Sequence, residues 1–102
     1  MPKSANSVLV IDDEPQIRRF VSAGLELHGF DVREASGGRA GLSAVVQTQP
    51  DLIVLDLSLP DMSGTEVLES VRAWSNVPSI VLSIDSAEEQ KVMLLKLGAD
   101  DY

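Results

Sequence analysis

Two short apolar runs, each ending at carboxylates, restrict what this chain can fold into. They read Val8-Leu-Val-Ile-Asp12-Asp13 and Asp51-Leu-Ile-Val-Leu-Asp56. A strand that is apolar on both faces is buried on both, as in a parallel sheet, and its carboxyl end opens into the crevice where α/β sheets bind ligands. If the two strands are neighbours, three like charges converge, and each raises the pKa of the others. A hard cation such as Mg²⁺ would neutralise them.

Length and charge narrow the class of protein. The 102 residues suffice for one domain, and 16 acidic against 8 basic residues give a net charge of −8, which argues against this domain binding nucleic acid through its own surface. There is no cysteine, so disulfides and thiolate metal sites are excluded. No apolar run approaches the roughly 20 residues of a membrane span. Because no signal peptide is visible, we expect a cytoplasmic protein without membrane contact, with residues 1–6 as a disordered lead.

Strand-like and helix-like segments alternate along the chain. Apolar residues recur near helical spacing between Ile17 and Leu27, with Pro15 suited to the first turn and Gly29 to the end of that helix. Ser86 and Glu89 have the spacing of a capping box. We expect strands at 7–12, 31–35, 51–56, 78–83 and from 100, and helices at 14–28, 39–47, 65–74 and 86–97.

This alternation predicts an α/β fold, a doubly wound parallel sheet with right-handed crossovers and helices on both faces. The flavodoxin-like strand order 2-1-3-4-5 would set the first and third strands side by side and bring Asp12, Asp13 and Asp56 together. A few other orders remain open, because spacing alone does not decide among them.

Four segments, in order and spacing, resemble the receiver domain of two-component response regulators, which has the CheY-like form of this fold. The last of these segments, at the C-terminal end of the chain, is typical of the OmpR/PhoB subfamily. A branch of that subfamily that regulates potassium-transport genes is resembled by two shorter runs, Ile17-Arg-Arg-Phe20 and Arg72-Ala-Trp-Ser-Asn-Val-Pro78. The four segments are Val8-Leu-Val-Ile-Asp12-Asp13-Glu14-Pro15, Pro50-Asp-Leu-Ile-Val-Leu-Asp56-Leu-Ser-Leu-Pro60-Asp-Met-Ser-Gly64, Pro78-Ser-Ile-Val-Leu-Ser83 and Leu97-Gly-Ala-Asp-Asp-Tyr102.

The resemblance implies that Asp56 accepts a phosphoryl group from a phosphohistidine on a sensor histidine kinase. It also implies a Mg²⁺ site, with Asp13 as a direct ligand and Asp12 acting through water. Asp56 itself and the backbone carbonyl of Ser58 would complete the protein ligands. The simpler alternatives are that Asp56 caps the loop after its strand and that Asp12 and Asp13 only favour the next helix's N-terminus.

Further roles follow from the same resemblance. The Ser83 hydroxyl would bond a phosphoryl oxygen, and Tyr102 would be the switch aromatic that turns inward as Ser83 moves. Pro60 and Gly64 would shape the loop beside Asp56. Ile84 stands where the family usually has a small residue, so we expect it to narrow access to the phosphoryl pocket. Unchanged phosphorylation and dephosphorylation rates in Ile84→Ala would refute that expectation.

The chain also departs from the family pattern. The family's Lys, three residues beyond the switch aromatic, has no position here, and the end of the fifth strand and the whole fifth helix are missing. We therefore expect residues 7–102 to form a receiver domain that is incomplete at its C-terminus. OmpR/PhoB receivers dimerise through the face of helix four, strand five and helix five. Binding to DNA would belong to an effector domain that is absent from this chain.

Three other functions compete with this interpretation, under which the chain modifies itself and turns over no metabolite. A Mg²⁺ phosphatase like the haloacid dehalogenases wants a second Asp two residues after the nucleophile, where Ser58 stands. A flavodoxin-like protein needs a loop after the first strand that accepts phosphate, which Asp12 and Asp13 would repel. A pseudo-receiver would keep the fold without using phosphate, and the missing Lys leaves that possibility open.

Overall fold

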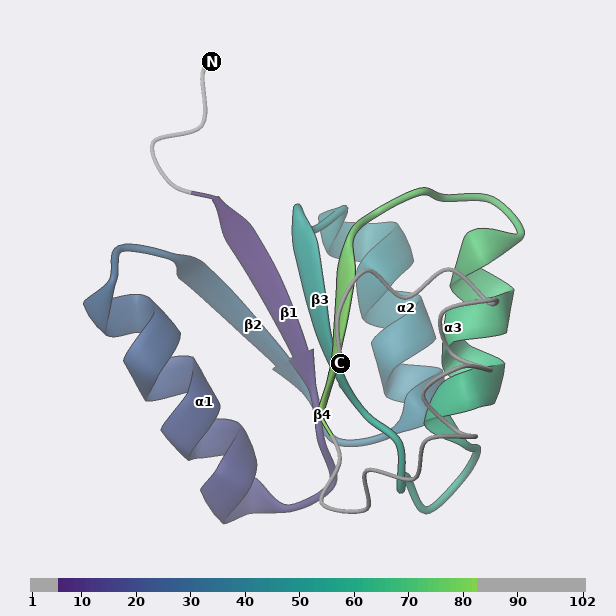
Figure 1. The fold of residues 1–102 in the computed structure, drawn as a ribbon, viewed down its shortest axis with the longest axis horizontal. Helices are drawn as coiled ribbons and strands as arrows, with labels where there is room; N and C mark the ends of the chain where they lie inside the picture. The colour runs from purple at the N-terminus through teal and green to yellow at the C-terminus, as the bar shows by residue number, and fades with distance from the viewer. Residues whose placement is uncertain (1–5, 83–102) are drawn as a thin grey trace.

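The computed structural model describes residues 6–82, which form a parallel four-stranded sheet in the order β2-β1-β3-β4 with three connecting helices (Figure 1). This order confirms the predicted flavodoxin-like topology over the first four strands. The expected helix at 86–97 and the fifth strand lie outside the described residues. The elements are β1 (Ser7–Ile11), α1 (Pro15–Leu27), β2 (Asp31–Ala35), α2 (Gly38–Thr48), β3 (Leu52–Asp56), α3 (Gly64–Arg72) and β4 (Ser79–Leu82).

Helices cover both faces of the sheet: α1 lies on one side, and α2 and α3 lie together on the other (Figure 1). Successive side chains of a strand point to opposite faces, so each central strand supplies two cores. The core under α2 and α3 contains Leu9, Ile11, Ile53, Leu55, Val45, Val67, Leu68 and Val71. The core under α1 contains Val8, Val10 and Val54, with the partly buried Val21 and Leu25 packed on it. The near-continuous apolar runs of β1 and β3 are therefore explained by burial on both faces.

The predicted boundaries agree with the observed elements to within two residues, and β2 is confirmed at both ends. The helical spacing of the apolar residues correctly predicts α1, but not all of these residues lie on the side of the helix that faces the sheet. Phe20 and Leu27 are 73% and 86% exposed. Val21 and Leu25, one turn apart, face the sheet instead.

Local features mark the end of α1, where the sequence predicts it, and the start of α3. Gly29 adopts a positive φ of 90° just beyond α1, a conformation that glycine reaches without steric cost. Ser63 caps α3 by accepting a 3.1 Å hydrogen bond from the backbone N–H of Glu66. In residues 6–82, no helix has both the length and the apolar character needed to cross a membrane.

Candidate functional site

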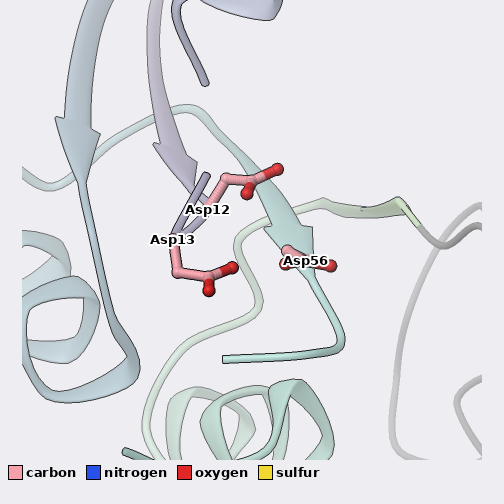
Figure 2. Close-up of side chains that lie close together, drawn as sticks. All are labelled: Asp12, Asp13 and Asp56. Carbon is pink, nitrogen blue, oxygen red and sulfur yellow. The ribbon is translucent and has the colours of Figure 1, made fainter. Parts of the chain in front are cut away.

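The register of the two central strands brings the three carboxylates together. β1 and β3 run parallel, with Ile11 beside Leu55, so Asp12 follows β1 at the level where Asp56 ends β3. Carboxylate oxygens of Asp12, Asp13 and Asp56 all lie within 4.8 Å of one another, at the carboxyl edge of the sheet (Figure 2). The predicted convergence of these residues is therefore present in the fold.

Asp12 is held rigidly at this edge and is only 3% exposed. Its backbone N–H donates to the carbonyl of Ala35 at 3.1 Å, and its Oδ1 accepts the N–H of Glu14, the N-cap residue of α1, at 2.9 Å. The second of these bonds closes a turn immediately before α1. Only one of its two carboxylate oxygens is engaged in that bond, so the same residue can also serve the acidic cluster.

Asp56 is electrostatically the most perturbed member of the cluster. Partial burial, together with the charges of Asp12 and Asp13, raises the pKa of Asp56 to about 6, although a 3.3 Å hydrogen bond from the Ser58 N–H opposes the rise. A carboxylate whose pKa is perturbed by burial and by specific charged neighbours is a functional-site candidate. Burial is the largest cause of the raised pKa, the nearby negative charges of Asp12 and Asp13 add to it, and a bound cation would offset those charges.

The donor set fits a hard cation. Three carboxylates supply only oxygen ligands, and Asp13 and Asp56 remain partly exposed, so water can complete a coordination shell. Mg²⁺ prefers such sites, with few carboxylates and several retained waters. The structure therefore fits Mg²⁺ at this acidic pocket. The expected ligand role of the Ser58 carbonyl remains a proposal.

The loop after β3 approaches the site closely because it contains Gly64. A Cβ at this position would lie 2.5 Å from the Asp56 carbonyl oxygen and 2.8 Å from the Leu57 Cα. The Gly64 N–H also donates to the Leu57 carbonyl at 3.0 Å. These contacts place Gly64 against the end of β3, and the expected roles of Gly64 and Pro60 in shaping the loop stay predictions.

Sequence reasoning overlooked two residues that hold this region. In the sequence, Asp61 stands only within the family-like segment that ends at Gly64, yet its carboxylate caps α2 by accepting hydrogen bonds from the N–H groups of Gly38 and Arg39. Arg18 was seen only as part of a family-like segment, yet its side chain reaches the carbonyl of Asp12. The Asp61 contact joins distant segments, and the Arg18 contact with Asp12 spans the turn between β1 and α1, so neither follows from the spacing rules for helices or strands. Ser83, Ile84 and Tyr102 lie outside the described residues.

The strand order of the sheet and the three carboxylates at its carboxyl edge are those expected of a receiver domain. The chain belongs to the response regulator receiver domain family, whose model matches residues 8–102. It is similar to the transcriptional regulatory protein KdpE of Mycobacterium tuberculosis, with 50% identity over 93% of this chain and 42% of that protein. The KDP operon transcriptional regulatory protein KdpE of Escherichia coli is 48% identical over 94% of this chain and 43% of its own length.

These matches confirm the predicted resemblance to the OmpR/PhoB-type regulators and to KdpE in particular. The chain spans less than half the length of the curated relatives that it matches. Among solved structures, a CheY-like receiver domain protein from Methanospirillum hungatei superposes with a TM-score of 0.90 at 31% identity. That superposition covers 97% of this chain and 80% of the other.

Proposed function

We propose that this receiver domain accepts a phosphoryl group on Asp56 from a sensor histidine kinase, with Mg²⁺ bound by Asp12, Asp13, Asp56 and the Ser58 carbonyl. The observation that carries the proposal is the convergence of three carboxylates at the ends of β1 and β3. A chain gains nothing in stability from crowding like charges in this way. The arrangement makes sense as a site built for a cation and for phosphoryl chemistry.

In the proposed reaction, a carboxylate oxygen of Asp56 attacks the phosphorus of the phosphohistidine. The new O–P bond replaces the P–N bond, and the leaving imidazole nitrogen takes up a proton from solvent. Because the pKa of Asp56 is about 6, the carboxylate is mostly ionised and ready to attack at neutral pH. The Ser58 N–H holds one of its oxygens and limits its rotation. Bound Mg²⁺ would supply the neutralisation of charge that phosphoryl transfer needs.

The consequences of phosphorylation would pass to a larger protein. We propose that Ser83 and Tyr102 respond to the phosphoryl group and change the face of helix four, which controls dimerisation and DNA binding by an effector domain outside this chain. Two relatives bear the name KdpE, and one of these names refers to the KDP operon, which supports potassium-transport genes as the target. We further propose a cytoplasmic signalling module that turns over no metabolite.

Intact mass after incubation with acetyl phosphate and Mg²⁺ tests the proposal directly. We expect a Mg²⁺-dependent gain of one phosphoryl group, about 80 Da, which Asp56→Asn abolishes. A version extended through a fifth helix should react at least as well. If only the extended version reacts, the residues beyond Tyr102 are needed for the chemistry. If neither version reacts, the pseudo-receiver function replaces this one.

A further inference from the structure

Arg18 links α1, β2 and the acidic edge in a single contact network. Its Nη1 donates to the backbone carbonyl of Asp12 at 2.8 Å, and its Nε donates to Oε1 of Glu34 at 2.9 Å. The Arg18 side chain is only 19% exposed and that of Glu34 is 38% exposed. The planar guanidinium suits this task because its donors have fixed relative directions. Glu34 therefore orients Arg18, and Arg18 in turn holds Asp12.

The carbonyl that Arg18 holds belongs to the peptide joining Asp12 to Asp13. Fixing the orientation of that peptide plane also fixes the position of the Asp13 Cα, from which the Asp13 side chain leaves the backbone, because a peptide unit is planar. The N–H of Asp12 is bonded to Ala35 and its Oδ1 to Glu14. With Arg18 on its carbonyl, the backbone N–H, the backbone carbonyl and one carboxylate oxygen of Asp12 each have a protein partner, which restricts the movement of this segment.

We propose that Arg18 is a positioning residue for the cation site, holding the Asp12–Asp13 peptide in the geometry that the metal requires. The inference rests on the proposed function in one respect, that the acidic cluster binds Mg²⁺. Groups that orient metal ligands without touching the metal commonly alter its affinity by about 10- to 100-fold when they are removed. Arg18 also carries a positive charge, which by itself opposes cation binding. Positioning and charge therefore act in opposite directions and can be separated.

Mg²⁺ titration calorimetry on the full chain and three variants separates the positioning effect of Arg18 from the effect of its charge. Arg18→Lys keeps the charge but loses the planar fork, and Arg18→Met loses both. Arg19→Met removes the same charge from the neighbouring, exposed position and serves as the matched control. If Arg18 positions the site, both Arg18 variants bind Mg²⁺ about 10-fold more weakly, and Arg19→Met binds as the parent chain does or slightly more tightly. Urea unfolding without Mg²⁺ checks that each variant is folded.

The opposite pattern would overturn the inference. If Arg18 acts only through charge, Arg18→Lys matches the parent chain and Arg18→Met binds more tightly. Should Arg18→Met fail to fold, Arg18→Lys alone decides between the two. A second readout is the Mg²⁺ dependence of labelling by acetyl phosphate: its midpoint should move to higher Mg²⁺ in Arg18→Lys, while general damage to the fold would lower the rate at every concentration. A parent chain that binds no Mg²⁺ would refute the metal site itself and this inference with it.

Discussion

The carboxylate of Asp61 caps α2 from a distant loop, and its Oδ1 accepts a 2.8 Å hydrogen bond from the backbone N–H of Gly38. Its Oδ2 accepts a second bond, 3.0 Å long, from the N–H of Arg39. The N-cap residue of this helix is Gly37, which has no side chain that could accept a hydrogen bond from the first N–H groups of the helix. Asp61 therefore takes the role of the missing cap and fastens the loop after β3, which borders Asp56, to α2.

Asp61→Asn should lower the urea midpoint of unfolding at neutral pH. The two N–H groups hold the pKa of Asp61 below its ordinary value of 3.8, so its contribution to stability is present above that value. The contribution is lost as the pH falls through the lowered pKa, and the two proteins should converge in acid. Asp31→Asn, which removes the same charge from the exposed start of β2, is the control. A difference that persists unchanged at acid pH would contradict this account.

Asp56→Asn should stabilise the metal-free chain at neutral pH. Because folding raises the pKa of Asp56 from 3.8 to about 6, its ionised form destabilises the native state above pH 6, and this penalty vanishes below the ordinary pKa. We expect a gain of about 1 kcal/mol at pH 8, less than the full linkage value because the carboxylate still meets solvent. Urea unfolding of the parent chain and of Asp56→Asn, in EDTA at several pH values, measures this gain in the free energy of unfolding. An equal gain at pH 8 and pH 4 would exclude a titration of Asp56 as the cause.

Mg²⁺ should raise the melting temperature of the parent chain and do so more strongly at pH 8 than at pH 5. Protonation of Asp56 competes with the cation, and its pKa of about 6 sets the pH range of the change. A concentration of 100 times Kd would stabilise the fold by about 2.7 kcal/mol. Asp13→Asn should remove most of the effect, whereas Asp31→Asn should leave it. Stabilisation of equal size in all three proteins would mean that Mg²⁺ acts elsewhere.

Gly64→Ala should destabilise the protein and weaken Mg²⁺ binding together. The added Cβ would lie 2.5 Å from the Asp56 carbonyl oxygen, so either the loop or the end of β3 must move. Overpacking of this kind costs about 1–3 kcal/mol. Gly24→Ala is the matched control, since a Cβ there meets nothing within 4 Å inside α1. It should instead stabilise the helix by about 0.5–1 kcal/mol. Equal effects of the two substitutions on urea unfolding would refute the steric explanation.

Much of the fold follows from local patterns. The apolar runs of β1 and β3 predict buried parallel strands because no half-exposed strand could carry them. Pro15 and Gly29 bracket α1 through backbone preferences that need no tertiary contact. The exposed positions of Phe20 and Leu27 could not be predicted in the same way. Helical spacing tells which residues share a face but not which face meets the sheet.

The identity of the acidic site was determined by the sequence alone, since Asp12, Asp13 and Asp56 each stand where an apolar run ends. Side-chain periodicity and strand burial are local properties, and a chain displays them in its order of residues. The tertiary structure decided which strands are neighbours, and so brought the three carboxylates within 4.8 Å. It also decided that Arg18 and Asp61 support the site. Asp61 bonds α2 from the loop after β3, and Arg18 of α1 joins the residue after β1 to Glu34 of β2, so the packing of α1, α2 and the sheet brings those atoms within hydrogen-bonding distance.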